Sequence, residues 1–373
     1  MSAVAVTHAT DASPFSGLDV TVPAEIRGRI DFVLGLRHHW ANDLFHALRA
    51  QYERAVAASA ASPRSGEEAG PIVEALPLYP TFAWFERNIQ KMMWRALREA
   101  CEAQRDSLIA ALNAPVPSPI GSLELDRGLE LPDYYRNTEF HIQPGGIWSG
   151  DLNAFVYELG AKVIFLGQND DYAFHRLFTQ AAVPEGDYRD ILDMGCGFGK
   201  STRPFVDRFP AARVVGIDLS APVLKLAHRQ AEKLRKRIAF SQRAAEATGF
   251  ADSSFDLVTA TMVIHELPMP AVRRVLAEAY RLLRRGGRLI VLDYHRTRDP
   301  LRDFLFLGHA RRNNEPYMGH ILRVDTAALA HEVGFTDVTL VPFDERGGGP
   351  REDSTWPARD DWHFPWVVLR GRK

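Results

Sequence analysis

The sequence contains few cysteines, and its first residues do not resemble an export signal. Only Cys101 and Cys196 occur among 373 residues, which excludes a disulfide framework and a cysteine-rich zinc site. Two cysteines suit a reducing compartment, and the first 20 residues lack the basic start and apolar core of a secretory signal. We therefore expect a cytoplasmic protein.

The sequence also lacks an excess of charge of one sign and any long apolar run. Lys and Arg number 45 against 47 Asp and Glu, a formal net charge of −2, whereas nucleic-acid binders usually carry a dense basic face. No apolar run approaches the roughly 18 to 20 residues that a membrane span requires. We expect neither nucleic acid nor a membrane as a partner.

The apolar pattern divides the chain into three parts. With 373 residues, 46% of them hydrophobic, the chain is long enough for about two domains. Apolar residues at helical spacing fill residues 1–130, which we expect to form an all-helical N-terminal domain that caps the substrate or makes a homodimer contact. Residues 131–184 have a mixed pattern and are expected to form a connecting or lid segment. Residues 185–373 alternate short apolar strands with helical stretches, the pattern of a parallel sheet covered by helices on both faces.

The third part contains seven stretches with the length and composition of strands. They are residues 190–194, 213–218, 238–240, 255–260, 288–293, 336–342 and 366–369. We therefore expect an α/β fold with a seven-stranded, mostly parallel sheet and helices on both faces, preceded by the all-helical domain.

The first of these strands runs into a glycine-rich turn. Its sequence is Asp193-Met194-Gly195-Cys196-Gly197-Phe198-Gly199-Lys200. A dinucleotide-binding turn has the register G-x-G-x-x-G, and its third glycine would fall on Lys200. A phosphate-binding loop has the register G-x-x-x-x-G-K-[ST], and its first glycine would fall on Met194. What remains is an acidic residue followed by three alternating glycines.

This acidic-x-Gly-x-Gly-x-Gly pattern resembles the first motif of the class I S-adenosylmethionine-dependent methyltransferases. Glycines let the backbone approach a ligand closely, and an acidic strand end suits a cationic ligand better than a pyrophosphate. Asp218 ends the next strand, near the ~20-residue offset at which an acid binds ribose hydroxyls. The resemblance covers residues 187–373. Within the family, the chain is most similar to the small-molecule branch that contains the quinone-biosynthesis enzymes. It implies a Rossmann-like fold and S-adenosylmethionine as the cofactor.

The resemblance also implies which residues bind the cofactor. In the family a D-A-E-type segment usually meets the adenine, and this chain has Ala244-Ala245-Glu246 there, so a backbone amide near Ala245 would replace the usual acidic contact. The expected cofactor-binding residues are Asp193, Gly195, Cys196, Gly197, Gly199, Asp218, Leu219, Ala245, Glu246 and Thr261.

Acceptor-side residues of the family follow the fourth and fifth strands, because ligands lie beyond the carboxyl ends of parallel strands. His265 follows the fourth strand and could remove a proton from the acceptor, with Glu266 holding it; the alternative is a structural histidine bonded to a loop carbonyl. Tyr294 and His295 follow the fifth strand and could orient the acceptor. The expected catalytic residues are His265, Glu266, Tyr294 and His295.

Candidate substrate contacts come from the connecting segment and from the insertion after the fifth strand. They are Tyr134, Tyr135, His141, Gln143, Trp148, Tyr317 and His320. No metal is expected. The pairs His265-Glu266 and His331-Glu332 begin like the zinc motif H-E-x-x-H, but Met269 and Phe335 stand where its second histidine belongs.

The sequence thus predicts an S-adenosylmethionine-dependent methyltransferase of a small-molecule acceptor, methylated at oxygen, sulfur, nitrogen or carbon. One alternative is a non-catalytic protein that binds the cofactor or a partner. Another is a nucleic-acid methyltransferase, but the Asp/Asn-Pro-Pro-aromatic motif that such enzymes typically carry after the fourth strand is lacking.

Overall fold

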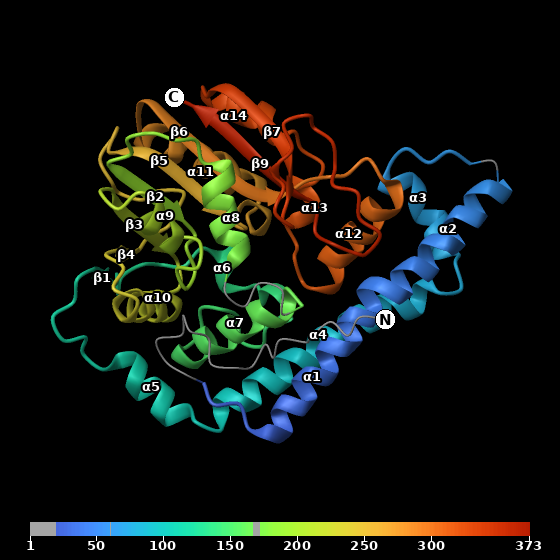
Figure 1. Ribbon diagram of the computed structural model, residues 1–373, viewed down its shortest axis with the longest axis horizontal. Coiled ribbons are helices and arrows are strands. Elements are labelled where there is room, and N and C mark those ends of the chain that lie inside the picture. Colours follow the sequence, from blue (N-terminus) through green and yellow to red (C-terminus); the bar gives the residue numbers. More distant parts are fainter. Residues whose placement is uncertain (1–19, 60, 167–171) are drawn as a thin grey trace.

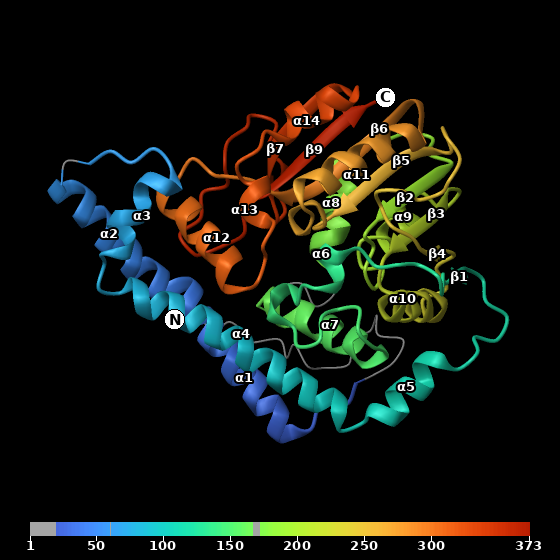
Figure 2. The same ribbon diagram turned by 180° about the vertical axis from the view of Figure 1, so that it is seen from behind.

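A computed structural model describes residues 20–59, 61–166 and 172–373 (Figure 1). It shows an α/β body with a layer of long helices along one side (Figures 1 and 2). The first elements are α1 (Ala24–His39), η1 (Trp40–Leu44), α2 (Phe45–Ser59), α3 (Gly66–Glu74), α4 (Tyr79–Glu102), α5 (Arg105–Asn113), β1 (Ser122–Glu124), α6 (Asp133–Arg136), η2 (Phe140–Ile142), α7 (Asp151–Ile164) and α8 (Ala173–Ala182). The remaining elements are β2 (Asp190–Met194), α9 (Arg203–Arg208), β3 (Arg213–Asp218), α10 (Ala221–Lys233), β4 (Ala239–Gln242), β5 (Phe255–Thr261), η3 (Ile264–Glu266), α11 (Met269–Leu282), β6 (Leu283–Tyr294), α12 (Pro300–Arg312), α13 (Met318–Ile321), α14 (Thr326–Val333), β7 (Thr336–Asp344), β8 (Gly349–Pro350) and β9 (Trp366–Arg372).

The described strands form a sheet in the order β1-β4-β3-β2-β5-β6-β9-β7-β8. Strands β1 to β6 pair in parallel, whereas β9 pairs antiparallel with both β6 and β7. The sheet therefore has nine strands, and the expectation of seven was wrong. The two additional strands, β1 and β8, have three and two residues. Strands this short contain no apolar alternation that a sequence could reveal.

The central strands are mostly apolar because helices cover both faces of the sheet. Ile191 and Leu192 of β2 are fully buried, as are Leu257 and Val258 of β5. Helix α10 packs against β3 and β4, and α11 packs against β5 and β6. The strand order reverses between β2 and β5, and the carboxyl ends of strands at such a reversal border the usual ligand crevice.

The helical layer is attached to the body at several points. Helix α4 packs against α1 and α7, and α7 packs in turn against α10 of the body. Strand β1 leaves the layer and joins the sheet beside β4, so the expectation that residues 1–130 are all helical was wrong at this strand. Residues 1–19 of that range lie outside the described residues. Among the described helices, none combines the length and apolar character that a membrane crossing needs.

The contact between α4 and α7 depends on a glycine. A Cβ atom at Gly160 of α7 would lie 2.3 Å from the Trp94 ring of α4. By contrast, a Cβ atom at Gly35 of α1 would meet no heavy atom within 4 Å.

We predict opposite effects of alanine at these two helical glycines. Gly160→Ala should lower the free energy of unfolding by roughly 1 to 3 kcal/mol, because the buried Trp94 ring must shift. The control Gly35→Ala should raise it by roughly 0.5 to 1 kcal/mol, because alanine favours a helix and has free space there. Urea unfolding of both variants measures the difference, and equal effects would show that the α4–α7 contact tolerates a wider spacing.

Candidate active site

The glycine-rich turn after β2 depends on left-handed backbone conformations. Gly195, Gly197 and Gly199 have φ angles of 69°, 52° and 79°. A Cβ atom at Gly195 would also approach Val263 to 2.4 Å, so no other residue fits this position without a shift. The turn thus brings bare backbone to the edge of a pocket that Gly195 and Gly197 line.

The two acids that flank this turn have different surroundings. Asp193 is fully buried, and its Oδ2 accepts hydrogen bonds from Ser201 and Thr202 at 2.7 and 2.6 Å. Asp218 lines the pocket, and its carboxylate accepts hydrogen bonds from the backbone N–H groups of Gly197 and Ser220 at 2.9 and 2.8 Å. Burial raises the pKa of each carboxyl to about 6. Asp193 therefore stabilises the turn from the buried side, away from the pocket, whereas the carboxylate of Asp218 faces the pocket where a ligand would bind.

Most of the expected cofactor-binding residues line this pocket. They are Gly195, Cys196, Gly197, Asp218, Leu219, Ala245, Glu246 and Thr261. Asp193 and Gly199 are not in its wall. At the expected adenine end, Tyr134 donates a hydrogen bond from its hydroxyl to Glu246 Oε1 at 2.6 Å. The connecting segment thus reaches the loop between β4 and β5.

His265 is fixed in the pocket wall by Asp293. Its Nδ1 lies 2.7 Å from Asp293 Oδ1, and only 2% of the residue is exposed. The other oxygen of Asp293 accepts the backbone N–H of Ile264 at 2.8 Å, and the Tyr294 ring lies 4.6 Å from the imidazole. Burial lowers the pKa of His265, but Asp293 outweighs it and raises the pKa overall. The side chain is therefore held by a carboxylate and not by the loop carbonyl that the sequence offered as the alternative.

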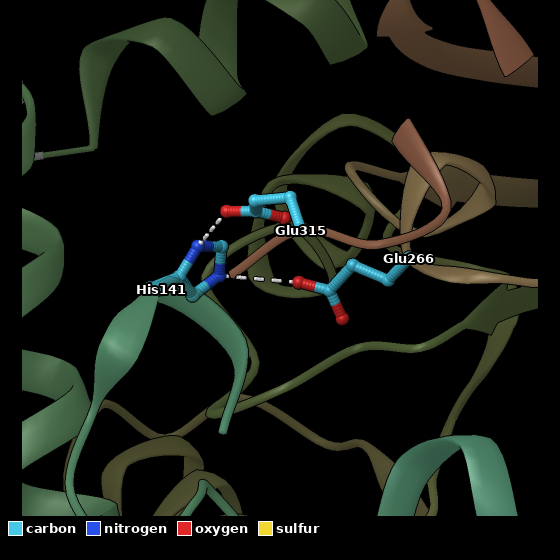
Figure 3. A group of neighbouring side chains, drawn as sticks. All are labelled: His141, Glu266 and Glu315. Atoms are coloured by element: carbon cyan, nitrogen blue, oxygen red, sulfur yellow. Dashed lines mark hydrogen bonds and ion pairs between the residues drawn. The ribbon is translucent and has the colours of Figure 1, made fainter. Parts of the chain in front are cut away.

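A second histidine lies between two carboxylates in the same pocket (Figure 3). His141 Nδ1 is 2.5 Å from Glu315 Oε1, and His141 Nε2 is 3.1 Å from Glu266 Oε1. Burial alone would lower the pKa of His141, but the carboxylates of Glu315 and Glu266 outweigh burial and raise it to about 10. With both nitrogens donating, His141 is a partly buried imidazolium at neutral pH. We call His141, Glu266 and Glu315 the charged triad.

The charged triad is also the place where a metal ion would find ligands among the described residues. One potential ligand atom of each residue lies within 4.8 Å of the other two. However, a histidine binds a metal through a deprotonated nitrogen, and both ring nitrogens of His141 face carboxylate oxygens. His141 therefore cannot donate both of its N–H groups to the carboxylates and bind a metal ion at the same time.

Not every expected contact reaches the pocket. Of the expected catalytic residues, Glu266, His265 and Tyr294 line it, but His295 does not, and its Nδ1 faces the carbonyl of Arg296 at 3.3 Å. The expected substrate residues in the wall are Tyr134, Tyr135 and His141. Those outside it are Gln143, Trp148, Tyr317 and His320. Gln143 is fully buried and donates a hydrogen bond to the carbonyl of Asn153.

Among the charged residues of the pocket, Arg37, Lys200, Arg243 and Glu315 were missed in the sequence. Glu315 follows two asparagines in a polar loop, a context that carries no recognisable pattern. Arg37 lies on a helix remote from the glycine turn in sequence. Lys200 had a usable signal, since it directly follows the last glycine of the turn.

We predict that the stabilisation by His141 depends on pH. Because its folded pKa of about 10 exceeds the ordinary value of 6.5, this stabilisation is complete below pH 6.5 and is lost as the pH rises through 10. His141→Gln leaves the buried Glu315 and the partly exposed Glu266 without their cation and should cost roughly 1 to 3 kcal/mol near pH 6.5. The gap in Tm between the native protein and the variant should narrow towards pH 10. The exposed His320→Gln is the control, and a gap for His141→Gln that does not change with pH contradicts the assignment.

The chain is similar in sequence to known methyltransferases. A family model described as a methyltransferase domain matches residues 191–287. The ubiquinone/menaquinone biosynthesis C-methyltransferase UbiE of Paracoccus denitrificans is 36% identical over 156 residues, which cover 40% of this chain and 61% of that protein. The chain thus spans about three fifths of that relative. The enzyme of the same name from Desulfotalea psychrophila is 30% identical over 193 residues, covering 50% of this chain and 72% of that protein.

Among solved structures, phosphoethanolamine N-methyltransferase 2 of Haemonchus contortus in complex with S-adenosyl-L-methionine is 17% identical. The match covers 66% of this chain and 61% of that chain, with a TM-score of 0.44. The extent of the similarity to the Desulfotalea protein places the chain in a family, and the order of strand, glycine turn and acid agrees with it. The chain belongs to the class I S-adenosylmethionine-dependent methyltransferases, in the branch that contains the quinone-biosynthesis enzymes.

Proposed function

We propose that the protein transfers a methyl group from S-adenosylmethionine to a carbon atom of a small quinol-like acceptor. The observation that carries the proposal is the sharing of one pocket by the glycine turn, Asp218 and the charged triad. The names of the UbiE relatives support carbon as the methylated atom.

The residues present fit the cofactor. S-Adenosylmethionine supplies an activated methyl group on a positively charged sulfur. Because Gly195 and Gly197 have no side chains, the cofactor could lie directly against the backbone of the turn. Asp218 would accept hydrogen bonds from the ribose hydroxyls of the cofactor. Glu246 has an oxygen, Oε2, that is buried and has no hydrogen-bond partner among the described residues. That oxygen could accept an N–H of the ligand.

Lys200 would bind the carboxylate of the cofactor. The ammonium group lines the pocket and lies over the rings of Tyr157 and Phe198, at 5.8 and 5.2 Å. Burial lowers the pKa of Lys200 to about 8. No carboxylate of the described residues forms an ion pair with it, and a partly buried cation without a carboxylate partner is suited to an anionic ligand.

Glu266 is the proton acceptor of this proposal. One of its oxygens accepts a hydrogen bond from the His141 imidazolium, and the other has no hydrogen bond to the described residues. When a quinol hydroxyl gives its proton to Glu266, the electron pair on the ring oxygen enriches the adjacent ring carbon, which then accepts the methyl group. The methylated carbon loses its own proton, the ring oxygen regains one, and the net result is one proton released to solvent. His265, which Asp293 holds in place, lies in the pocket wall and would orient the ring.

We predict that Glu266→Gln lowers turnover by roughly a hundredfold to ten-thousandfold, because the proton acceptor is lost. The assay combines the protein, S-adenosylmethionine and naphthohydroquinone, with mass spectrometry and NMR to detect the methyl group and the atom that carries it. Binding of S-adenosylhomocysteine should stay within about threefold of the native value.

The matched control is Glu332→Gln, which removes an exposed carboxylate on α14. Full turnover in Glu266→Gln contradicts its role as the proton acceptor. Cofactor binding without a methylated product from any quinol, thiol or amine would instead favour the non-catalytic alternative.

The role of Lys200 has a separate test. Lys200→Met should weaken binding of S-adenosylhomocysteine by about tenfold to a hundredfold, because a charge-assisted hydrogen bond is lost. Binding of methylthioadenosine, which lacks the amino-acid part, should not change. Calorimetric titration measures both affinities. An equal loss for the two ligands would mean that Lys200 supports the pocket without contacting the carboxylate.

A further inference from the structure

A second cavity adjoins the pocket that holds the charged triad. It has a volume of about 530 Å³ and lies between the helical layer and the C-terminal part of the chain. The two share wall residues, among them Arg37, Gln90, Phe165, His309 and Phe364. The two cavities are therefore neighbours that border on the same side chains.

The wall of the second cavity is rich in aromatic side chains. They are Trp40, Phe165, Phe174, Trp362, Phe364 and Trp366. They come from both parts of the fold, with Trp40 from the helical layer and Trp366 from strand β9. Such a wall suits a flat or extended apolar group, because aromatic faces offer large contact areas.

Most charged side chains that border this cavity are already paired. Glu86 accepts from His309 Nδ1 at 2.5 Å and from Arg312. Near the other end, Arg359 forms ion pairs with Glu345 and with Asp361. The charges of these side chains are therefore neutralised by partners within the protein, and they do not need a ligand.

Arg37 is the exception in the shared wall. Its Nη1 donates a hydrogen bond to the amide oxygen of Gln90 at 2.7 Å, and its buried Nε has no partner among the described residues. Burial lowers its pKa to about 10, so the guanidinium keeps its charge at neutral pH. A buried guanidinium usually faces a carboxylate or a phosphate, whose geometry its planar fork matches.

Gln90 connects Arg37 to the charged triad. While its oxygen accepts from Arg37, its Nε2 donates to the carbonyl of His141 at 3.3 Å. Arg37 thus lies in the wall that the two cavities share, and only the side chain of Gln90 separates it from His141 of the charged triad.

We propose that Arg37 binds an anionic oxygen group on the acceptor, while the apolar body of the acceptor occupies the aromatic second cavity. This inference rests on the proposed function for the identity of the ligand as an acceptor. In this proposal the helical layer contributes to substrate selection, because it supplies the cation Arg37 and part of the aromatic wall of the second cavity. A neutral acceptor of the same shape leaves the guanidinium desolvated and unpaired, and binds less well for that reason.

The test uses three probes with the same ring: naphthoate, naphthyl phosphate and the uncharged naphthol. Their binding at pH 7 to the full chain, saturated with S-adenosylhomocysteine, is followed by the quenching of tryptophan fluorescence, because Trp40, Trp362 and Trp366 line the cavity. We expect at least one anionic probe to bind about tenfold or more tightly than naphthol. The better of the two anions identifies the group as a carboxylate or a phosphate.

Two substitutions assign this preference to Arg37. Arg37→Met should abolish it while leaving naphthol binding within about twofold. Arg37→Lys keeps the charge without the fork and should retain part of the preference. The matched control is Arg29→Met, which removes another α1 arginine that pairs with Glu99 outside the cavity, and it should retain the full preference.

Two results would overturn the inference: equal binding of all three probes to the native protein, or an anion preference that persists in Arg37→Met. Should Arg37→Met fail to bind S-adenosylhomocysteine, the decision rests on Arg37→Lys, where an undiminished preference contradicts the role of the fork. Probe binding needs no methyl transfer. An anion preference in a protein that methylates no acceptor therefore rejects the proposed function and not the anion site.

Discussion

The imidazolium of His141, held between two carboxylates, is the contact on which the arrangement of the pocket depends. It joins η2 of the connecting segment to η3 after strand β5 and to Glu315 after helix α12. In a low-dielectric interior, two carboxylates at this spacing need a cation between them. The residue has a φ of 58°, a conformation that costs an L-amino acid roughly 1 kcal/mol or more. Trp94 of the helical layer donates a hydrogen bond to its carbonyl at 2.7 Å, so sheet, insertion and helical layer meet at this residue.

The parts of the fold that could be predicted from sequence are those with a local pattern. Buried strands such as Asp190–Met194 are short, mostly apolar segments, and the glycine turn has a register that distinguishes between ligand classes. The strands β1 and β8 escaped prediction because their pairing partners, and not their composition, make them strands. The offset from the glycine turn to the end of the next strand similarly indicated Asp218, which lies in the pocket wall.

The chemistry of the site was less predictable because it depends on contacts between distant segments. The sequence placed His265 and Glu266 side by side and suggested that Glu266 would hold His265. In the structure Asp293 holds His265, and Glu266 turns to His141. Nothing within the neighbourhood of Glu315 indicates that it meets a histidine 174 residues earlier. Likewise, Asp193 belongs to the ligand motif by spacing, but its hydroxyl partners place it beneath the turn.

The short π-helical turn η1 sets how the second cavity can change size. A π turn leaves a backbone carbonyl without its usual α-helical partner. Here the carbonyl of Ala41 accepts a hydrogen bond from the backbone N–H of Trp362 at 2.7 Å, which ties the helical layer to the C-terminal segment across the cavity. The layer is tied to the sheet at β1 as well. Because the layer is fixed at both places, a swing of the helices as one rigid lid would have to break both contacts.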